Sequence, residues 1–245
     1  MSLARTAYAW AIGVLYTLFW ATLGIVTWPL SPRGELYLKY ARIWSAWILA
    51  SLRIPLTIER RAPLDPHASY LFMSNHRSIF DIFALFLATE HSLRMVAKRE
   101  LFYIPILGWS LWMCGFIPID RSNRPQAIES LNEAARRIRA GTSVLVFPEG
   151  TRNPGGVGLQ SFKKGGFMMA LQAAAPIVPV AVLGSERIMP KGALTVGRGS
   201  ITVRVGAPIV TAGRDAEKRD LLIAEVRTAM EDLLADPVAA EKRGP

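Results

Sequence analysis

The chain has 245 residues and a formal net charge of +10, from 29 lysines and arginines against 19 aspartates and glutamates. This length suits one large α/β domain, and the positive charge favours partners with phosphate or carboxylate groups, such as nucleic acid, anionic lipid or an anionic substrate. A single cysteine excludes an internal disulfide framework, and three scattered histidines match no zinc-binding spacing, so we expect no metal site.

The N-terminal segment carries no charged residue from Thr6 to Pro32. As a helix, residues 7–28 match the hydrocarbon thickness of a bilayer. A cleaved signal peptide fits poorly, because the apolar region exceeds the usual roughly 7 to 15 residues and lacks a small-residue exit before Trp28. A buried core helix is the alternative, although the segment has no polar face. We therefore expect a membrane-associated helix that either crosses the bilayer or lies within one leaflet.

The following segment, residues 35–52, has an interfacial pattern. Glu35, Lys39 and Arg42 fall on one helical stripe, and aromatic and aliphatic residues cover most of the rest. Five of the seven tryptophans lie within the first 47 residues, and indole rings suit the boundary between headgroups and acyl chains. We predict that residues 1–53 form a two-helix membrane-docking segment and that residues 54–245 form the α/β domain.

Beyond Pro55, short apolar runs alternate with amphipathic stretches, separated by Gly, Pro and Asn. This rhythm predicts an α/β fold with a mixed, mainly parallel sheet flanked by helices. The predicted strands are residues 56–59, 70–74, 93–97, 116–119, 143–147, 177–183 and 201–205. The predicted helices are residues 79–88, 124–140, 165–174 and 216–235, and the tail after Asp236 is expected to fray.

Polar side chains follow four of the predicted strands. If these strands run parallel, all four groups open onto one edge of the sheet, where open α/β sheets bind their ligands. The sequence thus predicts a site rich in cations with one histidine, formed by His76, by Lys98 and Arg99, by Asp120 and Arg121, and by residues 149–152.

The stretch SNHRSIFD, residues 74–81, allows two interpretations. In the first, Ser78 and Asp81 form a capping box for a helix that begins near Ile79, and His76 is an ordinary turn residue. In the second, His76 lies in the turn before the helix and Asp81 accepts a hydrogen bond from one imidazole nitrogen, which leaves the other nitrogen basic. His76 would then be a general base for a hydroxyl, with Asp81 as its orienting partner.

No side chain has the setting of a covalent nucleophile. There is no G-x-S-x-G motif, and Cys114 lies in an apolar run where a buried structural thiol is expected. The substrate must then supply the hydroxyl, which indicates direct acyl transfer. Arg152 is placed to bind an anion, because its planar guanidinium suits phosphate, and nearby cations add to the same positive field: Lys98, Arg121, Lys163 and Lys164.

These motifs, in this order, resemble the glycerolipid acyltransferase family, particularly its bacterial 1-acyl-sn-glycerol-3-phosphate acyltransferases. The family's first block, N-H-x-x-x-x-D, is matched by Asn75, His76 and Asp81. The other blocks resemble GFIPIDR at residues 115–121, FPEGTR at residues 147–152 and IVPVAV at residues 177–182. The first block alone is weak, but together with the third it is highly specific.

The resemblance implies that a fatty acyl group passes from coenzyme A or acyl carrier protein to the sn-2 hydroxyl of lysophosphatidate, forming phosphatidate for phospholipid synthesis. It implies a catalytic pair of His76 and Asp81, acceptor phosphate held by arginines, and Glu149 near the glycerol. No metal or other cofactor is implied. The expected substrate-binding residues are Asn75, Lys98, Arg121, Glu149, Gly150, Thr151 and Arg152. The helix pair resembles the membrane-docking element of bacterial members, which implies a location at the cytoplasmic face of the inner membrane.

Other interpretations stay open. The same chemistry could act on lyso-ornithine lipid, glycerol 3-phosphate or another lysophospholipid, although a phosphate-free acceptor would leave the arginines without a use. A non-catalytic membrane lipid-binding protein would predict damaged motifs, whereas these motifs are intact. Nucleic-acid binding is disfavoured, because the aromatic residues gather in the N-terminal segment instead of alternating with lysine and arginine.

Overall fold

A computed structural model describes residues 3–154 and 158–235 of the chain. Its seven-stranded sheet has the order β1-β7-β6-β2-β5-β3-β4. The strands are β1 (Leu56–Arg60), β2 (Leu71–Ser74), β3 (Leu93–Lys98), β4 (Ile117–Ile119), β5 (Ser143–Val146), β6 (Ile177–Leu183) and β7 (Ile201–Val205). β2 to β6 run parallel, whereas β7 is antiparallel to β6 and β1 runs with β7. The predicted mixed, mainly parallel sheet is confirmed.

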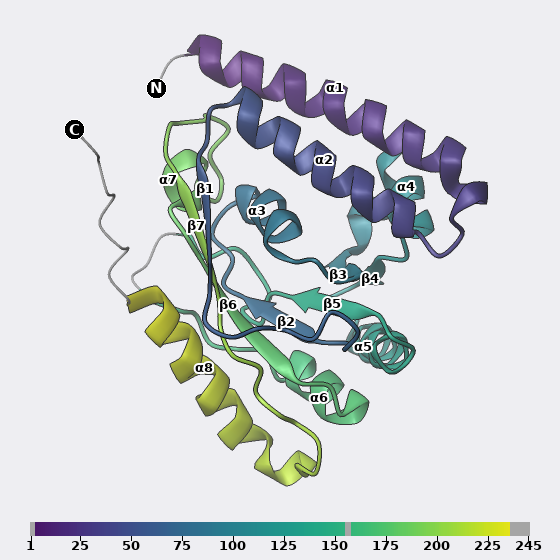
Figure 1. Ribbon diagram of the computed structural model, residues 1–245, viewed down its shortest axis with the longest axis vertical. Coiled ribbons are helices and arrows are strands. Elements are labelled where there is room, and N and C mark those ends of the chain that lie inside the picture. The colour runs from purple at the N-terminus through teal and green to yellow at the C-terminus, as the bar shows by residue number, and fades with distance from the viewer. Residues whose placement is uncertain (1–2, 155–157, 236–245) are drawn as a thin grey trace.

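Helices cover both faces of this sheet (Figure 1). One face carries α1 (Leu3–Thr27), α2 (Glu35–Ser51), α3 (Phe80–Ala88) and α4 (Leu107–Met113). The other carries α5 (Arg124–Arg139), α6 (Lys164–Ala173) and α8 (Arg219–Ala235). Shorter connections are α7 (Ser185–Ile188) and the 3₁₀ helices η1 (Trp28–Leu30), η2 (Arg99–Tyr103) and η3 (Ala216–Lys218). The result is a three-layer α/β sandwich.

The alternation of side chains along β2 shows why both layers are needed. Successive strand residues point to opposite faces, so Phe72 packs with the helices of the α1–α3 layer while Leu71 and Met73 pack with the opposite layer. All four residues of β2 are buried. An apolar run without polar alternation is typical of a parallel strand covered on both faces, and β2 accordingly lies near the middle of the sheet.

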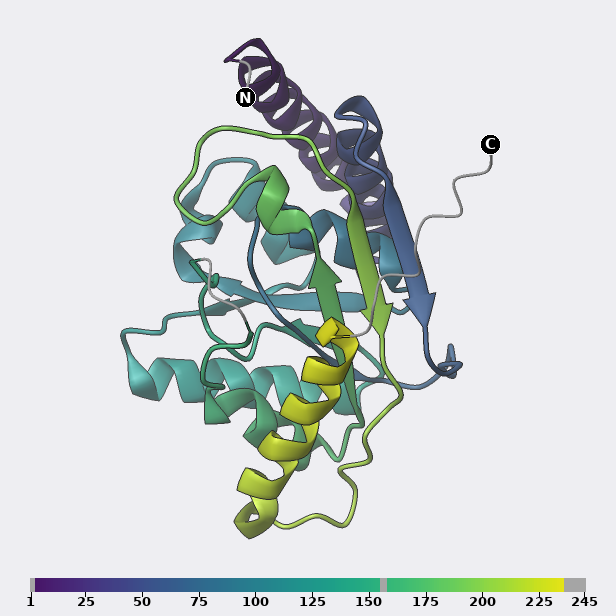
Figure 2. The same ribbon diagram turned by 90° about the vertical axis from the view of Figure 1, so that its left-hand side faces the viewer.

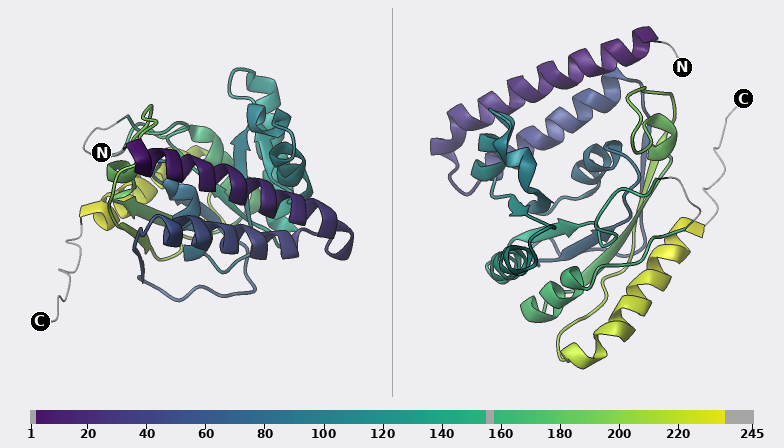
Figure 3. Two further views of the ribbon diagram at one scale, coloured as in Figure 1. Left: turned by 90° about the horizontal axis from the view of Figure 1, so that it is seen from above. Right: turned by 180° about the vertical axis from the view of Figure 1, so that it is seen from behind.

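The two helices predicted at the N-terminus are present, and they pack against α3 and α4, which lie between them and the sheet. The Trp44 ring of α2 meets the Phe83 ring of α3 edge-on, with centroids 4.8 Å apart, and one apolar cluster joins Ala9 and Ile12 of α1 to α2 and α3. Figure 3 shows α1 lying lengthwise over α2 and α4. Leu3–Leu30 is long and apolar enough to cross a membrane, by length and composition, and 22% of its most apolar window is buried.

The sequence did not predict α4. Its residues, LGWSLWM, show no polar face, and the helix begins only after Ile106, whose φ of 67° is rare for a β-branched residue. The predicted helix at residues 216–235 is present, but its first turn is the 3₁₀ helix η3. The tail after Asp236, which was expected to fray, lies outside the described residues.

Candidate active site

The predicted contact between His76 and Asp81 is present. His76 lies in the turn between β2 and α3, and its Nδ1 is 2.8 Å from Asp81 Oδ2. The same oxygen accepts hydrogen bonds from the backbone N–H groups of Arg77, at 2.7 Å, and Ser78, at 2.9 Å. Since a carboxylate that receives three contacts acts as an acceptor, Nδ1 is assigned as the donor, and the lone pair then lies on Nε2.

The capping interpretation of this stretch also holds in part. Asp81 lies in the first turn of α3, and its bonds to two backbone N–H groups complement the helix terminus. Ser78 Oγ accepts from the N–H of Phe80 at 3.2 Å and donates to the carbonyl of Met189 at 2.7 Å. The carboxylate therefore both begins the helix and orients the imidazole, so the two interpretations are compatible.

The imidazole of His76 is also held from one face. Its ring stacks on Phe147, with centroids 3.9 Å apart and planes 13° from parallel. The side chain keeps 15% of its surface exposed, and among the described residues Nε2 has no hydrogen-bond partner. The edge opposite Asp81 is therefore the part of the ring that remains for a substrate. The sequence placed Phe147 in the FPEGTR block but assigned its ring no role.

Glu149 clamps the turn that carries His76. Its Oε1 accepts from the N–H of His76 at 3.1 Å, and its Oε2 accepts from the N–H of Gln160 at 3.0 Å. The residue is only 2% exposed, and the N–H of Asn153 donates to the carbonyl of His76 at 2.6 Å. Glu149 was expected to organise the acceptor, and the structure occupies both of its oxygens with backbone groups.

Asn75 is fully buried and extends the pairing of β2 with β6. Its Nδ2 donates to the carbonyl of Val182 at 2.8 Å, and its Oδ1 accepts from the N–H of Val182 at 2.7 Å. The Asn75 side-chain amide thus makes the two hydrogen bonds that the backbone of a neighbouring strand would make with Val182, at the point where the chain leaves β2. Asn75 was expected to bind substrate, but here it supports the His76 turn.

The loop after β5, residues 147–152, is called the catalytic turn below. Gly150 has a φ of 75°, which favours glycine, and a Cβ there would lie 3.2 Å from Lys163 Cγ. Arg121, from the end of β4, donates to the carbonyl of Gly150. Arg121 keeps an exposed surface, yet desolvation of its guanidinium lowers its pKa, and Glu100 opposes this shift. Arg121 stays cationic, because arginine does not deprotonate in proteins.

The remaining predicted cations differ in their surroundings. Arg152 is half-buried, and no hydrogen bond or ion pair engages its guanidinium among the described residues. Lys98 lies at the same sheet edge, but β5 separates its strand from β2, an offset of about 10 Å. Its ammonium is 2.8 Å from Glu100. The structure therefore brings Arg121 and Arg152 to the catalytic turn and leaves Lys98 at the rim.

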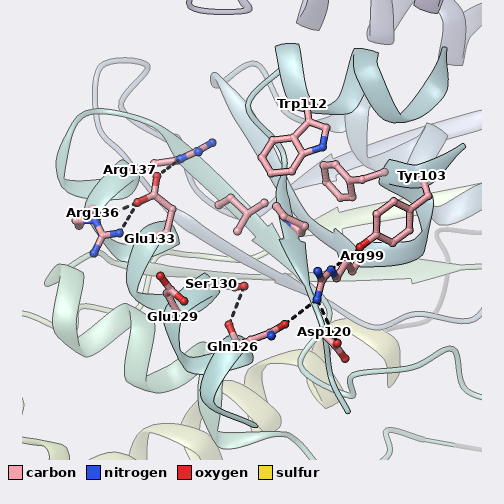
Figure 4. A pocket seen from close by; sticks show the side chains of 13 residues that line it. Arg99, Tyr103, Trp112, Asp120, Gln126, Glu129, Ser130, Glu133, Arg136 and Arg137 are labelled. Carbon is pink, nitrogen blue, oxygen red and sulfur yellow. Dashed lines mark hydrogen bonds and ion pairs between the residues drawn. The ribbon is translucent and has the colours of Figure 1, made fainter. Parts of the chain in front are cut away.

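An open groove of about 700 Å³ lies beside β4, and His76 is not among the residues that line it (Figure 4). Aromatic side chains of η2 and α4 form one wall, including Tyr103 and Trp112, and polar side chains of α5 form the other. Arg136 and Arg137 both contact Glu133, and Arg99 lies 3.6 Å from Asp120. Because these charges already balance one another, the groove offers less attraction for an anion than Arg152 does.

Cys114 is fully buried, and burial raises the pKa of its thiol to about 12. The expectation of a buried structural thiol is confirmed. Within the described residues, no group of three or more His, Cys, Asp or Glu side chains could hold a metal ion.

A family model described as Acyltransferase matches residues 55–183, which begin just after α2 and include His76, Asp81 and the catalytic turn. A coconut (Cocos nucifera) protein named 1-acyl-sn-glycerol-3-phosphate acyltransferase is 33% identical over 223 residues, covering 89% of this chain and 70% of its own length. A human protein named 1-acyl-sn-glycerol-3-phosphate acyltransferase alpha is 31% identical, covering 88% of this chain and 76% of its own length.

A solved structure shares nearly the whole fold. The crystal structure of the 1-acyl-sn-glycerophosphate acyltransferase PlsC from Thermotoga maritima superposes with a TM-score of 0.80 at 25% identity, covering 96% of this chain and 97% of that one. Some curated relatives are longer than the matched region. A chloroplastic protein from Brassica napus is 35% identical over 158 residues, which are 64% of this chain and 44% of that protein. The chain thus spans about half the length of some relatives it matches.

Proposed function

This chain belongs to the acyltransferase family, and on that premise we propose that it transfers a fatty acyl group from a thioester to the sn-2 hydroxyl of 1-acyl-sn-glycerol-3-phosphate, forming phosphatidate. The contact of His76 with Asp81, together with the Arg152 guanidinium that no described residue pairs, is the observation that carries the proposal. A base without a protein nucleophile suits an alcohol acceptor, and a nearby cation suits an acceptor with a phosphate. The names of the matched relatives support the same acceptor.

The reaction proceeds by direct attack. His76 Nε2 takes the proton as the acceptor oxygen bonds to the thioester carbonyl carbon, the C–S bond then breaks, and the proton passes to the leaving thiolate. Asp81 holds the ring through Nδ1 and stabilises the imidazolium that forms. The step needs no metal or other cofactor, and the donor is acyl-coenzyme A or acyl carrier protein.

The acceptor is positioned through its phosphate. Arg152 binds the phosphate oxygens, and Arg121, whose guanidinium already fixes the carbonyl of Gly150, offers further N–H donors to the same group. Anchoring the phosphate brings the sn-2 hydroxyl to His76, and positioning of this kind lowers a barrier by several kcal/mol.

The protein associates with the membrane through α1. Arg5, near one end of the helix, donates to the carbonyls of Leu52 and Gly197 at 2.8 and 2.9 Å. Near the other end, Gly24 lies so close to Tyr37 that a Cβ would come within 2.4 Å of its ring. A helix held at both ends against the rest of the molecule suits a position within one leaflet, along the membrane surface. We place it at the cytoplasmic face of the inner membrane, where acyl thioesters occur.

An acyl-transfer assay on detergent-solubilised protein tests the proposed acceptor. Lysophosphatidate and the monoacylglycerol with the same chain are compared, with acyl-coenzyme A and acyl carrier protein as alternative donors. We expect kcat/KM for lysophosphatidate to be higher by about a hundredfold, because charge-assisted hydrogen bonds to the phosphate contribute about 1.5–3 kcal/mol each. Equal values for the two acceptors would exclude a phosphate site, and transfer only to another phosphorylated acceptor would replace the acceptor named here.

A further inference from the structure

The segment between α7 and β7 connects the N-terminal helix to the active site. Residues 189–198, called the strap below, follow α7 and appear as the light green loop leading into β7 in Figure 2. On the α1 side, Trp10 Nε1 donates to the carbonyl of Leu194 at 2.9 Å, and the N–H of Val196 donates to Thr6 Oγ1 at 3.1 Å. The strap therefore follows the helix that we assign to the membrane.

The beginning of the strap contacts two turns of the active site, the turn that holds His76 and the catalytic turn. The carbonyl of Met189 accepts from Ser78 Oγ at 2.7 Å, in the turn that holds His76. Lys191 Nζ lies 3.3 Å from Thr151 Oγ1, in the catalytic turn beside Arg152. Lys191 is exposed, and its strap runs from the turns of the active site to α1, the helix that we assign to the membrane.

The charges around this point are unbalanced. Three other cations near the site face carboxylates: Lys98 with Glu100, Arg99 with Asp120, and Arg77 with Glu186. Lys191 and Arg152 flank Thr151 and have no carboxylate partner among the described residues. Two like charges at one turn repel each other unless an anion lies between them.

We propose that Lys191 binds the phosphomonoester group of the acceptor, together with Arg152, as the lipid arrives from the α1 side. This inference rests on the proposed function, and it adds a specificity-determining residue that belongs to none of the motifs in the sequence. An ammonium carries three N–H donors, so the bond to Thr151 leaves two for phosphate oxygens. The bond to Thr151 holds the Lys191 ammonium at the catalytic turn, where its two remaining N–H groups would bind the headgroup phosphate.

The first test is kinetic. In Lys191→Gln, kcat/KM for lysophosphatidate relative to monoacylglycerol should fall at least about tenfold, mainly through a higher KM for lysophosphatidate, because a charge-assisted bond to phosphate is lost. Arg198→Gln is the matched control. Arg198 is exposed on the same strap, and its replacement removes one positive charge, but no contact of Arg198 with the catalytic turn is present among the described residues. Its acceptor preference should equal that of the wild type. An equal fall in both variants would indicate a diffuse charge effect and overturn the assignment.

The second test is independent of turnover. Equilibrium binding of 1-oleoyl-lysophosphatidate in detergent micelles, with mono-oleoylglycerol as the uncharged reference, is measured for the wild type and both variants. We expect Lys191→Gln alone to bind the phosphorylated lipid at least about tenfold more weakly. An unchanged Kd, or a wild type that does not prefer the phosphorylated lipid, would contradict the role of Lys191. If the wild type does not acylate lysophosphatidate but Lys191→Gln binds this lipid more weakly than the wild type, the proposed reaction is wrong. The phosphate site at Lys191 would still be supported.

Discussion

A single carboxylate oxygen organises the start of the active site. Asp81 Oδ2 accepts from the imidazole of His76 and from the N–H groups of Arg77 and Ser78. The helix terminus and the catalytic base are thereby fixed by the same group, which leaves the imidazole little freedom to rotate. The sequence predicted this contact, because the five-residue spacing from His76 to Asp81 allows it only if the histidine lies in the turn.

Other residue roles depended on partners that a sequence does not display. Asn75 and Glu149 bind backbone groups that are distant along the chain, at Val182, His76 and Gln160. Every residue offers such N–H and C=O groups, so a motif cannot reveal which of them a side chain will meet. The motif identified the residues, and the structure shows which of them bind backbone groups of the turn.

Glu149→Gln distinguishes support of the turn from acceptor binding. The new amide can accept only one of the two backbone hydrogen bonds, so we expect a loss of about 1–3 kcal/mol in the free energy of unfolding, measured by denaturant titration. Catalysis should fall through kcat, because the His76 turn loosens.

Glu129→Gln, on the exposed face of α5, is the matched control and should preserve both properties. A Glu149→Gln variant with wild-type stability and a raised KM for the acceptor would assign Glu149 to the substrate instead.

At the scale of elements, α1 presents an apolar face that no other described part of the chain covers. Leu15 and Phe19 are 62% and 53% exposed. Their transfer into the interfacial region of a bilayer would remove this surface from water, which is worth about 1.5–3 kcal/mol for each fully buried side chain. The sequence predicted the helix from its apolar length, but its position along the molecule depends on contacts of Arg5 and Gly24 with later segments.

A double variant, Leu15→Ser with Phe19→Ser, should reduce sedimentation of the protein with phospholipid vesicles by at least about tenfold. Both side chains are largely exposed, so the far-UV circular dichroism, which does not depend on the ring contacts of Phe19 with Trp20 and Trp47, should remain that of the wild type. Leu221→Ser is the control, because Leu221 is 69% exposed on α8, on the opposite layer. A double variant that binds vesicles as strongly as the wild type would exclude this face of α1 as the membrane contact.

At the scale of the whole molecule, the arrangement of the sheet decides where the chemistry takes place. All seven strands could be predicted, since most are short, mainly apolar runs bounded by turn residues. The predicted common edge also holds, because β2, β5, β3 and β4 are parallel neighbours. Their carboxyl ends bring residues far apart in sequence to one place. The strap was not predicted, because a segment without periodicity contains no signal of what it will contact.

The central claim is that His76 is the base of an acyl transfer. The most direct measurement is the rate of phosphatidate formation by His76→Ala at saturating lysophosphatidate and donor, with circular dichroism to verify the fold. We predict a fall in kcat of about 10²–10⁴-fold, because general base catalysis contributes that much, while lysophosphatidate still binds through Arg152 and Lys191. A folded His76→Ala protein that transfers the acyl group at the wild-type rate would contradict the account.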